Sequence, residues 1–288
     1  MNFMVDLSMP IVMGVLLGGL YAVIALGLSL VFGVVREMNI AHGDLVVLGS
    51  YFGYVAMTVL GIDPIVSLVM GIPLLLGIGF LIQKYLLNRA FKVSMDATLI
   101  IAFGLSIILQ NVFQLIWTPF PRGLTTSYAM TSLTLGPVRF PLVYLLDFIS
   151  AIVVMIFLRE FLKRTYLGKA IRAAAQNRKS AQLMGINTDQ VFALTFAISM
   201  AFAAIAGIFL GLTFPFTPIS GMSFLIIALG VVVLGGLGSI LGTFVGGIAF
   251  GLAQTLGGHF FGVAAQMLVA YMMVLVVLAV IPRGIFGR

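Results

Sequence analysis

Long apolar runs separated by short polar loops dominate this chain, and the pattern predicts a bundle of membrane-spanning helices. A helix needs about 20 apolar residues, with about 17 as a practical lower limit, to cross a bilayer. Several runs are short and interrupted by glycine, so one or two of them could enter and leave the membrane by the same side, which leaves eight full spans as an alternative. Nine runs meet the description, at about residues 10–34, 44–60, 64–86, 96–117, 141–162, 190–212, 222–238, 241–258 and 262–281.

Composition supports a membrane location and excludes a soluble globule. The chain is 62% hydrophobic and 8% charged, with 288 residues and a mean hydropathy of +1.24, so it lacks the polar surface that a soluble fold requires. The apolar runs are unbroken rather than alternating over ten residues, which favours helices over a barrel. We expect an all-α polytopic membrane helix bundle with about eight or nine transmembrane or re-entrant segments. Residues 1–288 would form a single transmembrane domain, with a polar insert at about 163–189.

Basic residues predict the orientation, because Lys and Arg accumulate in short cytoplasmic loops. Two predicted segments separate the first basic loop from the second, and four separate the second from the tail. Because an even number of spans separates them, the two basic loops and the basic tail lie on one side of the membrane, so the C-terminus is expected in the cytoplasm. Nine full spans would put the N-terminus outside, and eight would put it inside. No Lys or Arg precedes the first apolar run, so we expect that run to be retained rather than cleaved. The basic residues are Lys84, Arg89 and Lys92; Arg159, Lys163, Arg164, Lys169, Arg172, Arg178 and Lys179; and Arg283 and Arg288.

The loop expected on the opposite side runs from about Thr118 to Phe140. It carries only Arg122 and Arg139 and is rich in Pro, Thr and Ser. This composition predicts an external loop.

Glycine provides a second structural signal. Among 33 glycines, many are spaced four apart, which predicts flat helix faces that pack closely in lipid. The run of Gly235, Gly236 and Gly238 is denser than packing requires, so a break or re-entrant turn near a permeation path is the alternative there. The spaced pairs include Gly14 and Gly18, Gly49 and Gly53, Gly207 and Gly211, and Gly247 and Gly251.

Enzyme chemistry is not expected. The chain has no cysteine and eight scattered acidic residues, and His42 and His259 lack metal-ligand spacing, so we expect no catalytic, cofactor or metal site. No G-x-x-x-x-G-K-[ST] loop is present; Gly168-Lys169 is followed by alanine, so this chain should not hydrolyse ATP. The net charge of +7 lies at helix ends and reflects topology rather than nucleic-acid binding. Transport is the best general class.

A first polar constellation, Arg36 to Asp44, interrupts two apolar runs. One interpretation is a cytoplasmic turn, in which Gly43 permits an unusual backbone angle and Asp44 caps the next helix. The other is that Asn39, His42 and Asp44 line a water-filled passage or a half-helix break, since ionisable groups at membrane depth are costly unless they face a cavity or a partner.

A second constellation, Gly168 to Ile186, is a polar and helix-prone insert. Alanines and long side chains favour a helix to Gln176, Ser180 can cap a second short turn and Gly185 can end it. Asp189 is expected to cap the following span. The insert could be a basic amphipathic helix resting on anionic lipid. Small residues beside a few exposed aliphatics favour insertion into a groove on another protein.

Three separated motifs carry a resemblance to a known family: M-N-I-A-H-G-D at residues 38–44, the insert G-K-A-I-R-A-A-A-Q-N with A-Q-L-M-G-I ending at Ile186, and G-V-V-V-L-G-G-L-G-S-I-L-G at residues 230–242. Together with the hydropathy pattern they cover nearly the whole chain. The sequence resembles the permease subunits of bacterial ABC importers for branched-chain amino acids, the high-affinity hydrophobic amino acid uptake family.

The resemblance implies that the insert is a cytoplasmic coupling helix seated in a cleft of a separate ATPase. It also implies that the first and third motifs lie near the translocation path. The implied coupling residues are Gly168, Arg172, Ala173, Ala174, Gln176, Asn177, Ala181, Met184 and Gly185. The implied path residues are Asn39, His42, Gly43, Asp44, Gly235, Gly236 and Gly238.

The resemblance further implies partners and a location. The partners would be two ATP-binding cassette subunits that use the ATP, a second related permease, a periplasmic or extracellular substrate-binding protein and membrane lipid, with no nucleic acid. The location would be the bacterial inner membrane, and leucine, isoleucine and valine are the first choice of substrate. Transport would proceed by alternating access driven by ATP.

Two other functions compete with this one. An ion-gradient-driven secondary transporter could use Asp44 and His42 as coupling groups, but this leaves the insert without a role. A membrane scaffold with no transport role is the third possibility.

Overall fold

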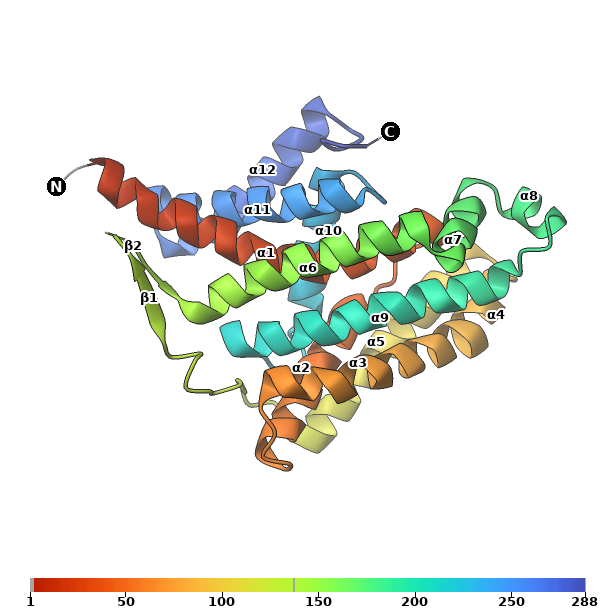
Figure 1. The fold of residues 1–288 in the computed structure, drawn as a ribbon, viewed down its shortest axis with the longest axis horizontal. Coiled ribbons are helices and arrows are strands. Elements are labelled where there is room, and N and C mark those ends of the chain that lie inside the picture. Colours follow the sequence, from red (N-terminus) through yellow and green to blue (C-terminus); the bar gives the residue numbers. More distant parts are fainter. Residues whose placement is uncertain (1–2, 137, 288) are drawn as a thin grey trace.

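The computed structural model describes residues 3–136 and 138–287 as a bundle of helices (Figure 1). The elements in chain order are α1 (Phe3–Val35), α2 (His42–Thr58), α3 (Pro64–Leu81), the π-helix η1 (Ile82–Leu87), α4 (Asn88–Phe91), α5 (Met95–Trp117), β1 (Ser132–Leu135), β2 (Val138–Pro141), α6 (Leu142–Arg164), α7 (Tyr166–Gln176), α8 (Arg178–Leu183), α9 (Thr188–Thr213), α10 (Gly221–Gly235), α11 (Ile240–Phe261), the 3₁₀ turn η2 (Val263–Ala265) and α12 (Gln266–Val280).

Each of the nine predicted apolar runs corresponds to a helix. Within the described residues, seven helices are long and apolar enough to cross a membrane. The remaining two, α2 with 17 residues and α10 with 15, are shorter. The prediction of a polytopic membrane helix bundle is therefore confirmed.

Two helices form the centre of the bundle. In the most apolar 18-residue stretch of each helix, 78% of α1 and 83% of α9 is buried inside the protein, compared with 17% of α5 and 11% of the last span, Val263–Val280. Figure 1 shows α1, α6 and α9 along the long axis, with α11 and α12 on one side and α2, α3 and α5 on the other. The outer helices therefore present most of their apolar surface outward, where lipid or another membrane protein would cover it.

Glycines let the central helices approach at backbone distance, as their spacing predicts. A Cβ at Gly251 of α11 would lie 2.6 Å from the Gly18 nitrogen of α1, and one at Gly207 of α9 would lie 2.8 Å from the Gly49 Cα of α2. Such contacts hold helices by van der Waals packing where lipid provides no hydrophobic drive.

The basic loops share one end of the bundle, called the basic end below, where Arg36, Arg159, Lys163 and Arg172 line one cavity. The C-terminal tail reaches the same end: the Ile285 amide donates to the Leu234 carbonyl (2.9 Å) at the end of α10. The basic loops and the tail therefore lie at one end of the bundle, which agrees with the even number of predicted spans between them.

The opposite end carries the loop between α5 and α6. Arg122 and Phe216 exchange backbone hydrogen bonds of 2.9 and 2.8 Å. The second half of this loop, which its composition predicts to be external, is a hairpin in which Leu133 pairs with Phe140. The hairpin forms because Val138 and Phe140 pack with Leu16 of α1, a contact that composition does not reveal.

We predict that Gly251→Val disrupts the α1–α11 seam. The added side chain would overlap the Gly14 carbonyl and approach the Gly18 nitrogen, and overpacking of this kind costs about 3 kcal/mol. A lower thermal unfolding midpoint in detergent would show this loss. The matched control is Gly104→Val, because a Cβ at Gly104 meets nothing within 4 Å; equal loss in both variants would contradict the assignment.

Candidate translocation and coupling sites

The chain is interrupted between α1 and α2, and α2 starts deep within the bundle. The ring N–H of His42 donates to the Ile24 carbonyl at 2.9 Å. Ile24 lies 11 residues before the end of α1 at Val35, which is about 16 Å along the helix. The first residues of α2 therefore lie well inside the bundle, and the structure favours the half-helix break over the simple cytoplasmic turn.

Asp44 does not cap α2, contrary to one of the two interpretations. The N-cap residue is Ala41, which makes no side-chain capping bond. The Asp44 carboxylate instead accepts hydrogen bonds from the Ser106 hydroxyl (2.5 Å) and the Gln110 amide (3.2 Å) of α5. Neither partner was predicted from the sequence, although Ser106 and Gln110 lie four residues apart on an apolar helix and therefore share one face, which was a usable signal.

Gly43 is required for packing and not for an unusual backbone angle. A Cβ there would overlap the Gly221 carbonyl at the start of α10. The left-handed backbone in this region is at Arg36, with φ 61°. The first turns of α2 and α10 thus meet at Gly43 and Gly221.

Asn39 belongs to the same buried group. Its side-chain oxygen accepts from the Ala41 amide at 3.1 Å, and its side chain is buried together with those of His42 and Asp44. The structure therefore brings together the four predicted path residues of the first motif.

The predicted path glycines of the third motif lie elsewhere. Gly236 (φ 96°) and Gly238 (φ 79°) form the sharp turn between α10 and α11, and a Cβ at Gly238 would meet the Gly33 backbone at 2.9 Å. Gly235 is 14 residues beyond Gly221 on α10, or about 21 Å away. The two predicted groups occupy opposite ends of one short helix.

The insert folds as two helices, α7 and α8, with caps that differ in part from the prediction. Thr165 caps α7, and the Asn177 side chain caps α8 by accepting from the Ser180 amide at 3.0 Å. Ser180 is therefore not the cap. Asn187, rather than Asp189, caps α9. The helix begins at Thr188, so Asn187 occupies the N-cap position and Asp189 already lies in the first turn. Gly185 (φ 82°) ends the insert as predicted.

The predicted coupling residues divide by exposure. Gly168, Ala174 and Ala181 are buried within the chain and Ala173 is half-buried, whereas Arg172, Gln176, Asn177, Met184 and Gly185 are exposed. The buried group attaches the insert to the bundle; a Cβ at Gly168, for example, would overlap the backbone of α6 at Phe161. Only the exposed group is available to another molecule.

Three large apolar side chains add to this exposed surface. Tyr166 is 86% exposed, Leu183 is 89% exposed and Met184 is 83% exposed. Tyr166 was not predicted to belong to this surface, because it lies just before the motif and no sequence pattern marks it.

Arg178 ties α8 to the bundle through a cluster that we call the Arg178 clasp, made of Arg178, Asp189, Lys92, Phe91 and Phe192. The guanidinium bonds Asp189 at 3.1 Å and lies 4.5 Å from the Phe91 ring centre and 5.1 Å from that of Phe192. Lys92 pairs with the other Asp189 oxygen at 3.0 Å. The clasp joins α8 to α4 and α9.

Glu37 connects the α1–α2 interruption with the clasp. Burial raises the pKa of its carboxyl from 4.5 to about 7, while a hydrogen bond with Thr98 and the charge of Arg178 act in the opposite direction. A buried carboxylate therefore faces the cation of the insert from the segment that leads into α2.

No group of three potential metal ligands occurs among residues 3–136 and 138–287.

These features define a polytopic membrane protein with a projecting basic insert, and comparison with known proteins gives its family. Residues 11–278 match the family described as "Branched-chain amino acid transport system / permease component". The chain belongs to this family, and it is the permease component of an ABC transporter rather than the ATPase.

Relatives cover almost the whole chain. It is 33% identical to the high-affinity branched-chain amino acid transport system permease protein BraD of Pseudomonas aeruginosa, over 96% of this chain and 95% of BraD. It is 32% identical to the corresponding permease protein LivH of Escherichia coli K12, over 96% and 94%. A probable branched-chain amino acid transport permease of Methanocaldococcus jannaschii is 25% identical, over 95% and 90%. No solved structure matches the chain.

We predict that Glu37→Gln raises stability above about pH 7. The unfolded carboxyl ionises near pH 4.5 and the folded one near pH 7, so the folded state holds more protons in this window and stability falls as the pH rises through it. Glutamine removes that loss, so the unfolding midpoint should rise by a few degrees at pH 8 and change little at pH 4.

The matched control is Glu160→Gln. Glu160 pairs with Arg164 at 2.5 Å, so its replacement should give no gain at pH 8. An identical pH profile for Glu37→Gln and the unmodified protein would refute the role of Glu37 burial.

Proposed function

We propose that this permease moves branched-chain amino acids into the cytoplasm in an importer driven by separate ATPase subunits. The names of BraD and LivH support the substrate class, because both are permease proteins of high-affinity branched-chain amino acid transport systems. The proposed assembly contains two ATP-binding subunits that handle the ATP, a second permease and an external substrate-binding protein. Its location is the bacterial inner membrane, with the basic end and the C-terminus in the cytoplasm.

One observation carries the coupling proposal: α7 and α8 present exposed apolar side chains at the basic end. Tyr166, Leu183 and Met184 extend from two short helices that other residues anchor to the bundle. Exposed apolar side chains on a helical projection fit a groove on a partner protein. Arg172, Gln176, Asn177 and Gly185 would form the polar rim of this contact, and Ala173 would lie at its edge.

The Arg178 clasp supplies a route from the ATPase to the membrane. A displacement of α8 acts on Asp189 at the start of α9 and on Phe91 at the end of α4. Because ATP can shift the permease between two states only by contacting them differently, a firm attachment of this kind is required.

The interruption between α1 and α2 is the proposed translocation site. Broken helices at membrane depth bring polar backbone and side-chain groups within reach of a passing solute. Asn39, His42, Gly43 and Asp44 would line this part of the path. Gly235, Gly236 and Gly238 would form its turn at the cytoplasmic end, next to α1 at Gly33.

We predict that Met184→Glu abolishes ATP-driven uptake of leucine while the permease remains inserted. The substitution places a carboxylate on the apolar surface that would enter the ATPase groove, and a buried unpaired charge costs several kcal/mol. Uptake should be measured in vesicles with internal ATP and collapsed ion gradients, together with co-purification of the ATPase.

Met130→Glu is the matched control, since Met130 is 78% exposed but lies in the loop at the opposite end. Uptake at normal rates by Met184→Glu would exclude the proposed docking. Loss of uptake in the unmodified protein on collapse of the ion gradients would favour a secondary transporter.

We predict that Arg178→Ala uncouples the ATPase from transport. Loss of the guanidinium removes its bond to Asp189 and its contacts with two aromatic rings, together worth about 2 kcal/mol. The ATPase should still co-purify, but leucine uptake per ATP hydrolysed should fall about tenfold. Lys179→Ala removes the same charge from the next, exposed residue and should keep the normal ratio; equal ratios in both variants would exclude the clasp as the route.

A further inference from the structure

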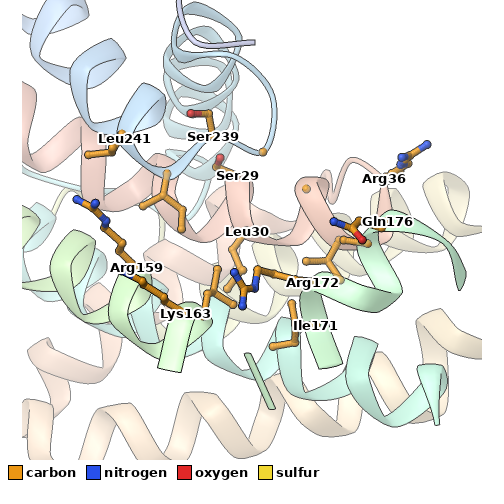
Figure 2. Close-up of a pocket in the computed structure, with 16 residues that line it drawn as sticks. Ser29, Leu30, Arg36, Arg159, Lys163, Ile171, Arg172, Gln176, Ser239 and Leu241 are labelled. Atoms are coloured by element: carbon orange, nitrogen blue, oxygen red, sulfur yellow. The ribbon is translucent and has the colours of Figure 1, made fainter. Parts of the chain in front are cut away.

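A cavity of about 850 Å³ opens at the basic end, between α1, α6, α7 and the turn that joins α10 to α11 (Figure 2). α1 and the residue after it contribute the stretch that ends at Arg36. The last turns of α6 and the exposed length of α7 contribute the side chains opposite. The cavity shares Gly33 and Gly238 with the proposed cytoplasmic turn of the path, and Arg172 and Gln176 with the edge of the proposed ATPase contact. Neither proposal uses its basic side chains on α6, and the Arg178 clasp lies outside it.

Its charge is entirely positive. Arg36, Arg159, Lys163 and Arg172 line it, and no Asp or Glu is among its described lining residues. Figure 2 shows Arg159 and Lys163 projecting from α6 and Arg172 from α7, with Arg36 at the other end near Gln176. Within the part of the chain that the structure describes, the ion pairs involve other residues, such as Arg164 with Glu160. Four basic side chains around one cavity create a positive potential that favours an anion.

Aliphatic side chains make up much of the remaining wall. Leu30, Val34, Leu162, Ile171 and Leu241 line the same cavity. Leu30, Val34 and Ile171 are buried, whereas Leu162 is half-buried and Leu241 is 43% exposed. A small hydrated anion would leave Leu162 and Leu241 in contact with water, whereas an amphiphile would cover them.

The apolar surface also continues along two helices away from the basic end. Ile156, three residues before Arg159 on α6, and Val245, four residues after Leu241 on α11, are both exposed. Residues at these spacings share a helix face. An anionic group held in the cavity could therefore carry a hydrocarbon chain that lies over Ile156 and Val245.

We propose that this cavity binds an anionic phospholipid, with its phosphate among the four basic side chains and its acyl chain along α6 and α11. Basic pockets between transmembrane helices suit anionic headgroups. Arg172 and Gln176 belong to α7, so a bound lipid would tie the first helix of the insert to α6. Lipid binding at this cavity does not depend on the proposed ATP coupling.

The test is a lipid titration by native mass spectrometry, using the full chain in mild detergent with any subunits that remain attached. Phosphatidylglycerol should bind the unmodified protein, and phosphatidylcholine should bind much more weakly. The double variant R159Q/K163Q should bind phosphatidylglycerol at least about tenfold more weakly. The double variant K84Q/R89Q loses the same charge at the basic end but lines a different cavity beside Asp189, and should bind like the unmodified protein.

Several results would overturn the proposal. One is equal phosphatidylglycerol affinity of R159Q/K163Q and K84Q/R89Q when both have normal unfolding midpoints. Another is equal affinity for phosphatidylcholine, and a third is displacement of the lipid by inorganic phosphate at millimolar concentration, which would identify a free-phosphate site. Release of the lipid when an ATPase subunit binds would assign the cavity to a protein partner. Because the measurement is lipid binding, failure of leucine uptake alone leaves the result unaffected.

Discussion

Between Val35 and His42 the chain leaves its helix and returns into the bundle, and the rest of the fold depends on how its polar groups find partners there. The Arg36 amide bonds the Phe32 carbonyl at 3.0 Å, and the His42 amide bonds the Asn39 carbonyl at 3.1 Å. The side chains of His42 and Asn39 satisfy further backbone groups. Without these bonds, unpaired backbone groups in hydrocarbon would each cost several kcal/mol. They fix the depth at which α2 starts, and hence the point where α2 meets α10.

Two kinds of contact surround this interruption. The α1–α11 and α2–α9 seams join backbone to backbone through glycine, and such contacts are intolerant of displacement. The contact of α5 with α2 runs through side chains: Asp44 with Ser106 and Gln110, and Tyr51 stacked on Trp117 with ring centres 4.4 Å apart. Side-chain contacts can be exchanged by rotamer changes, whereas the glycine seams cannot shift without repacking. We therefore expect any change between two states of the permease to move α5 relative to α2 and to leave the α1–α11 pair intact.

Hydrophobic runs were sufficient to predict the nine helices, because length and apolarity are what the bilayer selects. Glycine spacing likewise predicted that the helix faces carrying Gly18 and Gly251 pack closely, although it did not predict that these two faces meet each other. The partners of Asp44, by contrast, lie 62 and 66 residues away on α5. The spacing of apolar residues along the chain does not predict contacts between residues so far apart in sequence. Local capping rules failed at Ser180 and Asp189 for a related reason: Asn177 and Asn187 are equally good caps nearby, and Asp189 is engaged by Arg178 and Lys92. The four residues Asn39, His42, Gly43 and Asp44 lie together because they are neighbours in the sequence. Their separation from Gly235 depends on α10, whose direction the sequence does not give.

The size of the insert determines how it can act on the bundle. α7 has 11 residues and α8 has six, and helices this short are not stable alone in water. Their shape therefore comes from their attachments: Gly168 and Ala174 pack against the bundle, and Arg178 bonds Asp189. A partner that contacts Leu183 and Met184 can move the insert only by working against these same attachments. Because one attachment leads to α6 and the other to α4 and α9, a single displacement of the insert acts on two separate groups of spans. In the proposed coupling, this divided attachment is what would let so small a projection change the relative positions of helices across the membrane.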